Sequence, residues 1–454
     1  MAIQTQNPAT GEVLKTFEPH DDAFVDAAIA KAVDAQKEVA SWSFDKRRTC
    51  MEKMAAILDE EAGDFAKIIT LEMGKPYQQA IGEVKKCAWV CRYYAENAEA
   101  HLEKEYIESD AATSYRAFFP LGVIMAVMPW NFPFWQVFRF AAPAVMAGNA
   151  SLLKHASNVP QCALAMEDIF LRAGFPEGSL VTLLIGGSKV ERILRDKRVV
   201  AATLTGSEPA GASVAATCGS EIMPTVLELG GADACIIMPS ADIEKAVEIG
   251  SKSRLQNNGQ SCIAAKRFFV HADIYEDVKA RFVARFKALE VGDPMDEGTD
   301  IGPLVNEESY KEITRQVKDA LKSGAKHVFG GEAIEGEGFY FRPGILENIP
   351  PQSVAYHEEI FGPVMLLFKV QTLNEAITIA NESPFGLGSA IWTQDKAEQE
   401  EAIRSLQAGA TFVNSMTASD PRLPFGGIKK SGYGRELAEE GVRTWSNVKT
   451  VSIS

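Results

Sequence analysis

The chain has 454 residues, of which 46% are hydrophobic and 24% are charged, and its formal net charge at pH 7 is −15. This composition predicts a folded protein with more than one core, and the acidic excess argues against a nucleic-acid surface or a membrane-binding basic face. The sequence shows no secretory signal and no apolar run long enough to span a membrane, so we expect a cytoplasmic protein with free thiols. It also shows no CxxC pair and no metal-ligand spacing, so we expect no metal site.

The first part of the chain is helical in pattern, and alternating helices and strands follow it. Apolar residues spaced by three and four predict helices over about residues 21–105. A polar–apolar alternating stretch at 113–120 and a buried strand at 121–128 come next, and helices then alternate with strands up to residue 206. Such alternation predicts βαβ units and a parallel sheet covered by helices on both faces.

A second alternating series begins after Gly230-Gly231 and runs to about residue 415. Ligands bind at the strand ends of open α/β sheets, so we expect a cleft between two sheet domains near Gly230. The last stretch, 443–454, is predicted to be a strand that forms a protruding ribbon with 113–120. An exposed strand edge of this kind often pairs with another subunit.

Cys262 is the best candidate for a nucleophile among the seven cysteines. It ends the turn NNGQSC (257–262), which separates a predicted helix at 242–255 from a predicted strand at 266–270. A turn of small and amide residues holds a cysteine by its backbone and adds little bulk to cover the thiol. A lone cysteine in a turn is not specific, so the rest of the chain must supply a base and an anion stabiliser.

Three other segments lie within or directly after predicted buried strands and carry groups that could take part in chemistry. Glu228 lies in the apolar LELGG, where burial would raise its pKa as in a general base, although a paired structural glutamate fits equally well. Asn131, in PWNFP, offers an amide N–H to an oxyanion, although capping a helix is the commoner role. Gly206 and Ser207 open a GSxxxG strand–helix turn that would suit a phosphate, or that is simply a tight turn.

Seven motifs occur in order along nearly the whole chain: PWNFP (129–133), GSxxxG (206–211), LELGG (227–231), NNGQSC (257–262), EEIFGPV (358–364), NESPFGLGSAIWT (381–393) and PFGGIKKSGYGRE (424–436). With these motifs the chain resembles the aldehyde dehydrogenase superfamily, and within it the bacterial succinate-semialdehyde dehydrogenases. The resemblance implies the α/β aldehyde dehydrogenase fold. Its parts would be a Rossmann-like cofactor-binding domain (1–112 and 123–229), an α/β catalytic domain (230–434) and a β oligomerisation arm (113–122 and 435–454), in a homodimer or homotetramer.

The resemblance also implies a reaction. Cys262 would attack the aldehyde to give a thiohemiacetal, Asn131 would hold the oxyanion, and Glu228 would activate water to hydrolyse the resulting thioester. The implied substrate is succinic semialdehyde, with other small or ω-carboxylated aldehydes such as glutarate semialdehyde as the alternative. A catalytically idle relative kept for binding is a different class, against which the intact Cys262, Glu228 and Asn131 argue.

The cofactor contacts implied by the resemblance are Trp130, Lys154, Ser157, Gly206, Ser207, Glu359 and Phe361. NAD-preferring relatives often carry a glutamate at the position of Ser157, where it binds the 2′-hydroxyl of the adenosine ribose. Without that acid, Lys154 can pair with a 2′-phosphate. We therefore predict that NADP is preferred and that NAD is also used.

The implied substrate contacts are Arg139, Ser419 and Gln256. Arg139 falls where relatives bind the substrate carboxylate, and Ser419 would add a hydroxyl, although an interface or capping role for the arginine is also open. Gln256 replaces a second substrate arginine of some relatives, so the strength and selectivity of carboxylate binding are expected to differ. Phe140 replaces a lysine that relays protons in many relatives, so the proton of Glu228 must leave by another route.

Overall fold

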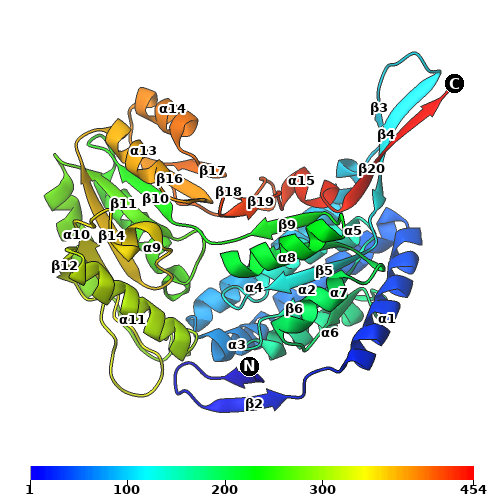
Figure 1. Ribbon diagram of the computed structural model, residues 1–454, viewed down its shortest axis with the longest axis horizontal. Helices are drawn as coiled ribbons and strands as arrows, with labels where there is room; N and C mark the ends of the chain where they lie inside the picture. Colours follow the sequence, from blue (N-terminus) through cyan, green and yellow to red (C-terminus); the bar gives the residue numbers. More distant parts are fainter. Residues whose placement is uncertain (1) are drawn as a thin grey trace.

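The structure is a computed structural model and describes residues 2–454. Two large, mostly parallel sheets lie side by side, each between layers of helices, and a narrow ribbon projects from one of them (Figure 1). The predicted α/β class with two sheet series is thus confirmed. Among the described residues, no helix combines the length and the apolar character needed to cross a membrane.

The first sheet has the strand order β19-β9-β8-β5-β6-β7, and all neighbours are parallel except β19 and β9. Its strands are β5 (Val123–Met128), β6 (Ala150–His155), β7 (Leu180–Thr182), β8 (Val199–Thr205), β9 (Thr225–Glu228) and β19 (Gly432–Tyr433). In the register, Met128 lies opposite His155 and Thr205 lies opposite Glu228, so the carboxyl ends of these strands meet at one edge.

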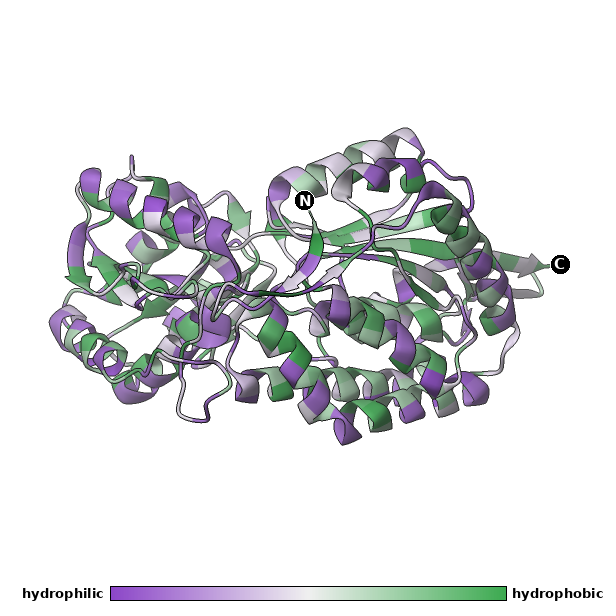
Figure 2. Ribbon diagram, turned by 90° about the horizontal axis from the view of Figure 1, so that it is seen from below, coloured by the Kyte–Doolittle hydropathy of each residue, from purple (hydrophilic) through white to green (hydrophobic). Residues whose placement is uncertain are grey.

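Helices cover both faces of this sheet because its apolar side chains alternate between them. In β5, Val123 and Met125 join one core cluster, whereas Ile124 and Ala126 join another. The first cluster includes α1 (Asp22–Ser41), α7 (Val190–Leu194), which follows η1 (Gly187–Lys189), and α8 (Glu208–Ser220). The second includes α2 (Phe44–Glu60), α3 (Ala62–Met73), α4 (Tyr77–His101), α5 (Trp135–Met146) and α6 (Pro160–Ala173). Figure 2 shows hydrophobic strands within the sheet and hydrophilic residues on the outer helices.

The second sheet has the order β12-β13-β14-β11-β10-β16-β17, and all its neighbours are parallel except β12 and β13. Its strands are β10 (Asp233–Ile237), β11 (Ala265–His271), β12 (Lys326–Phe329), β13 (Gly344–Glu347), β14 (Val364–Val370), β16 (Gly388–Trp392) and β17 (Ala410–Val413). One core cluster joins it to α9 (Ile243–Leu255) and α10 (Tyr275–Lys287). Another joins it to α11 (Glu307–Lys322), α12 (Val354–His357), α13 (Leu373–Asn381) and α14 (Lys396–Ser405).

Several elements carry too weak an apolar pattern to be predicted. Helix α14 buries only Ala402, and strand β2 (Val13–Phe17), paired with β1 (Ile3–Gln6), buries no residue. Strands β12 and β13 extend the second sheet at its edge, and β15 (Phe385–Gly386) with β18 (Ile428–Lys429) forms a short separate pair. Pairing and packing with segments that are distant in the sequence stabilise these elements, so their local apolar pattern does not reveal them.

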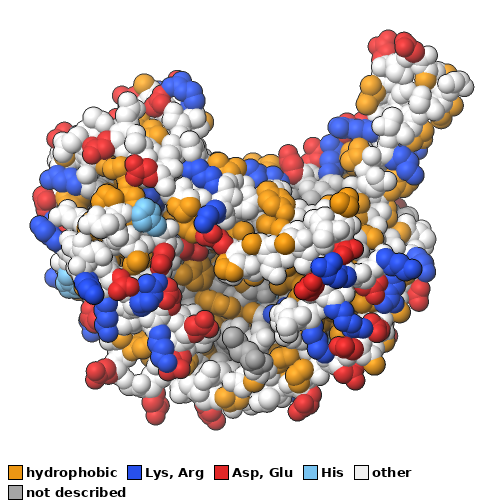
Figure 3. All heavy atoms as spheres, in the orientation of Figure 1, with side chains coloured by type: hydrophobic (Ala, Val, Ile, Leu, Met, Phe, Trp, Pro, Cys, Tyr) orange, Lys and Arg blue, Asp and Glu red, His pale blue; other side chains and the backbone are white. Residues whose placement is uncertain are grey.

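The projecting ribbon consists of β4 (Thr113–Pro120) between β20 (Ser446–Ile453) and β3 (Glu105–Tyr106). Both predicted strands, at 113–120 and near the end of the chain, are confirmed, and they pair antiparallel along their whole length. Figure 3 shows the ribbon at the upper right, clear of the rest of the molecule. The part of 435–454 that precedes β20 contains α15 (Ala438–Arg443), which packs on α4 and α5 and contacts the base of the ribbon through the Arg443–Glu105 ion pair.

Candidate active site

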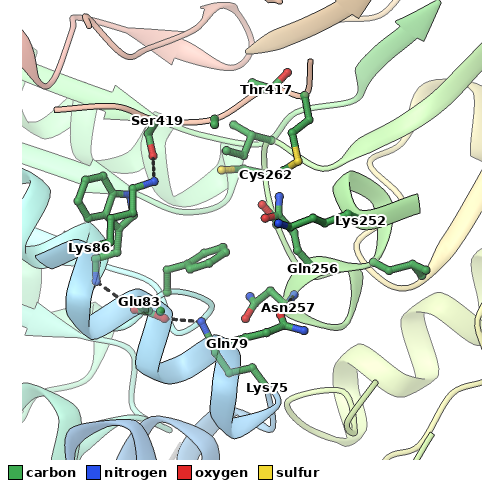
Figure 4. A pocket seen from close by; sticks show the side chains of 18 of the residues that line it. Lys75, Gln79, Glu83, Lys86, Lys252, Gln256, Asn257, Cys262, Thr417 and Ser419 are labelled. Carbon is green, nitrogen blue, oxygen red and sulfur yellow. Dashed lines mark hydrogen bonds and ion pairs between the residues drawn. The ribbon is translucent and has the colours of Figure 1, made fainter. Parts of the chain in front are cut away.

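A cavity of about 830 Å³ lies where the carboxyl edge of the first sheet faces the second sheet. It is lined by residues of α4, α5, α9, the turn after α9 and the segment 416–419 (Figure 4). Four predicted site residues line it: Arg139, Gln256, Cys262 and Ser419. Phe132, Trp135 and Phe425 add apolar surface, so the cavity combines a thiol, charges and a hydrophobic wall.

The turn that carries Cys262 is fixed by its own amide side chains. Asn257 and Asn258, in η2 (Gln256–Gly259), have φ values of 58° and 57°, a left-handed conformation that asparagine tolerates better than most residues. The Asn257 Nδ2 donates to the carbonyl oxygens of Asn131, at 2.7 Å, and Gln260, at 2.9 Å. The Asn258 Nδ2 donates to the carbonyl oxygens of Gly74 and Pro303, both at 2.8 Å. Buried hydrogen bonds therefore fix the position and the conformation of this turn.

A buried lysine fixes the backbone of the predicted nucleophile by hydrogen bonds. Lys266, the second residue of β11, is 1% exposed, and its Nζ donates to the carbonyl oxygens of Ser261 and Cys262 at 2.7 Å each. The same ammonium forms an ion pair with Glu359 Oε1 at 2.9 Å. The sequence pattern predicted only a strand entry here, and the adjacent Arg267 makes the pair look like an ordinary polar strand start.

The two glycines of LELGG allow the first sheet to approach this turn closely. A Cβ atom on Gly231 would lie 2.5 Å from the Cys262 carbonyl oxygen, and one on Gly230 would lie 2.6 Å from Glu359 Oε2. The Gly231 N–H also donates to Glu359 Oε1 at 3.1 Å. Glycine is therefore required at 231, where the contact is with backbone, whereas a side chain at 230 would displace the Glu359 carboxylate.

Asn131 keeps one amide N–H free of protein partners within residues 2–454 and does not cap helix α5. Its Nδ2 donates to the Gln260 carbonyl oxygen at 3.1 Å, and its Oδ1 accepts from Gln136 Nε2 at 3.1 Å, which leaves one amide N–H available. The backbone N–H of Cys262 also has no acceptor among the described residues. The N-terminus of α5 is instead satisfied by Glu83 Oε1, which accepts from the N–H groups of Phe134 and Trp135.

The Cys262 thiol is protonated at neutral pH in this environment. Burial raises its pKa to about 12, and the nearby carboxyl groups of Glu359 and Glu228 act in the same direction, while Lys266 and Arg139 oppose them. The thiolate is the reactive form of cysteine, so the site needs a group that removes the proton as the sulfur attacks.

Glu228, the last residue of β9, is buried beside a second carboxyl group. Burial raises its pKa well above the usual range, Glu436 raises it further, and Arg139 opposes the rise. Neither Glu228 oxygen has a hydrogen-bond partner among the described residues. Glu436, in the GYGRE motif, forms an ion pair with Arg139 and is likewise buried. Arg139 forms its ion pair with Glu436 and not with Glu228. The structure therefore gives no support to a paired structural role for Glu228.

Arg139 lies on α5, lines the cavity and is 2% exposed. In addition to the ion pair with Glu436, its Nη2 donates to Thr205 Oγ1 at 3.2 Å. Ser419 accepts a hydrogen bond of 2.7 Å on its Oγ from Lys86 Nζ, a contact that Figure 4 shows inside the cavity. The sequence did not predict Lys86, because the pair Lys85-Lys86 in a helical pattern is typical of an exposed helix face.

The predicted cofactor residues gather at the carboxyl edge of the first sheet. Lys154 is half-buried near the end of β6, burial lowers its pKa, and Ser157 follows in the next loop. Gly206 follows β8, and Ser207 stands before α8 without using its hydroxyl as a cap, so the first-turn N–H groups of α8 are open to an anion. The rings of Trp130 and Phe361 meet edge to face at 5.8 Å. An available cation and open helix N–H groups fit the phosphates of a dinucleotide.

Comparisons with known proteins agree with this geometry. A protein named succinate-semialdehyde dehydrogenase (NADP⁺) 1, from Mycobacterium tuberculosis (strain ATCC 25618 / H37Rv), is 53% identical over 100% of both chains. A probable succinate-semialdehyde dehydrogenase (NADP⁺) from Synechocystis sp. is 51% identical, also over 100% of both chains. The crystal structure of succinic semialdehyde dehydrogenase from Streptococcus pyogenes in complex with NADP⁺ matches with a TM-score of 0.97 and 39% identity, again over 100% of both chains. The sequence model described as the aldehyde dehydrogenase family matches residues 1–451, and the chain belongs to this family.

Proposed function

We propose that the protein oxidises succinic semialdehyde to succinate and prefers NADP as its cofactor. The observation that carries this proposal is the cavity in which Cys262 shares one lining with Arg139 and Ser419, groups suited to a carboxylate at the far end of the substrate. The names of relatives at 51% and 53% identity support the same substrate and cofactor. Glutarate semialdehyde and other small aldehydes are the second candidates.

The chain's own residues account for the addition of the thiol to the aldehyde and for the hydrolysis of the thioester. As the Cys262 Sγ attacks the aldehyde carbon, Glu228 takes the thiol proton and passes it to solvent. The free N–H of the Asn131 amide and the Cys262 backbone N–H donate to the oxyanion that forms. A bound nicotinamide dinucleotide supplies the hydride acceptor, and loss of hydride leaves a thioester on Cys262. Glu228 then takes a proton from the water that attacks this thioester, which releases the carboxylic acid and the free thiol.

The residues that would hold the cofactor follow from the strand ends. Trp130 and Phe361 would contact the nicotinamide end, and Glu359 would accept from the adjacent ribose. Lys154 and Ser157 would contact the adenosine ribose, and Gly206 with Ser207 would approach the phosphates. With serine and not an acid at 157, a 2′-phosphate meets the Lys154 charge without repulsion, which favours NADP.

The division into domains and the assembly belong to the same proposal. Residues 1–112 and 123–229 would form the cofactor-binding domain and residues 230–434 the catalytic domain, as the two sheets suggest. The ribbon would pair with another subunit in a homodimer or homotetramer, since Tyr106 and Val448 expose 70% and 52% of their surface. The seven free cysteines agree with a protein of the reducing cytoplasm.

The decisive experiment measures kcat/KM for succinic semialdehyde, glutarate semialdehyde and butanal, each with NADP⁺ and NAD⁺. Formation of the reduced cofactor is followed by its near-ultraviolet absorbance, and Cys262→Ala is the negative control. We expect the highest kcat/KM for succinic semialdehyde with NADP⁺ and no turnover in the variant. A higher value for butanal than for both semialdehydes would overturn the substrate assignment. No turnover of any aldehyde would favour a binding role.

A further inference from the structure

The positive charges that line the cavity are balanced by nearby negative charges, with one exception. Among the buried lining residues, Lys75 forms an ion pair with Glu83, and Arg139 forms one with Glu436, which is not part of the lining; all four side chains are exposed by 3% or less. At the mouth, exposed groups of both signs occur in equal number: Glu248, Lys252, Arg285 and Asp300. Water screens these outer charges and weakens their effect on a ligand deeper in the cavity.

Lys86 is the exception among the described residues, because no carboxylate lies within ion-pair distance of its ammonium group. The nearest acidic loop residue, Asp420, forms its own ion pair with Arg422 at 2.6 Å. A half-buried ammonium without a counter-ion loses hydration and gains no ion pair in exchange. An anionic ligand that binds there would offset this desolvation free energy.

The position of the Lys86 ammonium is fixed before any ligand arrives. It donates to Ser419 Oγ at 2.7 Å and lies 4.4 Å from the ring centroid of Trp135, which holds the stem along the cavity wall. An ammonium group has three N–H donors, so two remain for a ligand after the bond to Ser419. Figure 4 shows Lys86 and Ser419 approaching each other from opposite elements, α4 and the segment 416–419.

Arg139 and Lys86 repel each other across the cavity wall. The Arg139 charge lowers the pKa of both the Lys86 ammonium and the Cys262 thiol. Cys262 enters the cavity from the turn after α9, whereas Lys86 enters it from α4, beside Ser419. An anion bound there would meet two cations, of which only Arg139 is already neutralised by a carboxylate.

From these contacts we infer that Lys86, together with Ser419, binds the carboxylate of the substrate, and that Lys86 supplies the uncompensated charge that selects carboxylated aldehydes. This inference rests on the proposed function. Arg139 contributes a hydrogen-bonding surface and keeps Glu436 paired. Arg139→Ala is a poor test of carboxylate binding, because it would also leave Glu436 buried without a partner beside Glu228.

The test compares Lys86→Met and Lys86→Gln with Lys85→Met, which removes an exposed lysine from the adjacent position of α4. For each protein, kcat/KM is measured with succinic semialdehyde and with butanal, which has the same chain length and no carboxylate. We expect both Lys86 variants to lower the ratio of the two values by about ten- to a hundredfold, mainly through KM. Lys85→Met should keep the wild-type ratio. An unaltered ratio in folded Lys86 variants would overturn the inference.

Binding of succinate, measured by calorimetry, decides the same question without turnover. The Lys86 variants should bind succinate about tenfold or more weakly than wild type and Lys85→Met. Equal affinity in all four proteins would overturn the inference even if the substrate assignment holds. Conversely, a wild type that shows no preference for succinic semialdehyde overturns the proposed function, while weaker binding of succinate by the Lys86 variants still supports the anion site.

Discussion

The ammonium group of Lys266 donates to the carbonyl oxygen of Cys262 at 2.7 Å and pairs with Glu359 at 2.9 Å. One buried charge thus connects the backbone of the nucleophile to the carboxylate expected to bind the cofactor ribose. Because the contact is to the carbonyl and not to the sulfur, Lys266 acts by positioning the turn. Its charge also lowers the pKa of the thiol against the dominant effect of burial.

We predict that Lys266→Met destabilises the protein by about 2–4 kcal/mol, because two carbonyl oxygens and Glu359 lose a buried partner. Activity should fall as well, since the turn is no longer held in one place. Urea unfolding gives the stability, and steady-state kinetics give the activity. Lys245→Met, at an exposed position of α9, is the control and should match wild type. Equal stability of the two variants would show that the contacts to the turn contribute little.

The reactivity of the thiol supplies a second prediction. With a pKa near 12, Cys262 should react slowly with iodoacetamide at pH 7, and the rate should rise about tenfold per pH unit up to pH 10. Mass spectrometry of the Cys262 peptide in the cofactor-free protein measures the rate. The other six cysteines are buried and serve as internal controls that should stay unlabelled in the folded state. A plateau near pH 8.5 would mean that the thiol has an ordinary pKa.

Much of the fold and part of the site could be predicted from the sequence. Strands such as β5 and β8 are short apolar runs that end in proline or glycine, and the helices between them have strong periodicity. The parallel order places the strand ends at one edge, which agrees with the cleft expected near Gly230. The turn at 257–262 was recognisable because amide residues and glycine adopt the left-handed conformation that it needs.

The charged network of the site could not be predicted in the same way. Lys86 contacts Ser419 across 333 positions of the chain, and Glu436 reaches Arg139 from a motif near the C-terminus. Nothing in a local pattern shows whether a lysine in KK faces water or a cavity, since both faces of a helix tolerate its long stem. The partner of a buried charge depends on tertiary structure, so the sequence predicted Arg139 as a site residue and not the carboxylate that neutralises it.

The relationship between Glu228, Arg139 and Glu436 leads to a third prediction. The charge of Glu436 raises the pKa of Glu228 and occupies the arginine that would lower it. In Glu436→Gln the pKa of Glu228 should fall, so the acidic limb of the kcat–pH profile should move to lower pH by about one unit. Glu439→Gln, which alters a partly exposed carboxylate of α15, should leave the profile in place. A shift of the limb to higher pH would contradict this coupling.

The cofactor assignment predicts the effect of a single charge. Ser157→Glu should lower the kcat/KM ratio of NADP⁺ to NAD⁺ by about tenfold or more, because the new carboxylate repels a 2′-phosphate and competes for Lys154. Ser157→Ala removes the hydroxyl without adding charge and should keep most of the NADP preference. Steady-state kinetics with both cofactors measure the ratio. An unchanged ratio in Ser157→Glu would mean that this position does not contact the 2′ substituent.

The last prediction concerns pH and the Lys86 carboxylate site. Burial lowers the pKa of Lys86 to about 8, and Arg139 on α5 lowers it too. The acidic groups that oppose this shift are Glu83 and Cys87 on its own helix and Asp420 on the facing loop. The ammonium is therefore charged below pH 8 and loses its proton above it. The ratio of kcat/KM for succinic semialdehyde to that for butanal should accordingly be constant below about pH 7 and fall above pH 8, since kcat/KM reports the free enzyme.

Lys86→Arg separates this titration from other effects of alkaline pH. Arginine stays charged throughout the accessible range, so the ratio in this variant should stay level up to pH 10 even if its absolute value is lower. Titration of the thiol or of Glu228 alters both aldehydes alike and cancels in the ratio. A ratio that falls equally in wild type and in Lys86→Arg would assign the alkaline loss to a different group. A level ratio in both would mean that the Lys86 ammonium keeps its proton well above pH 8.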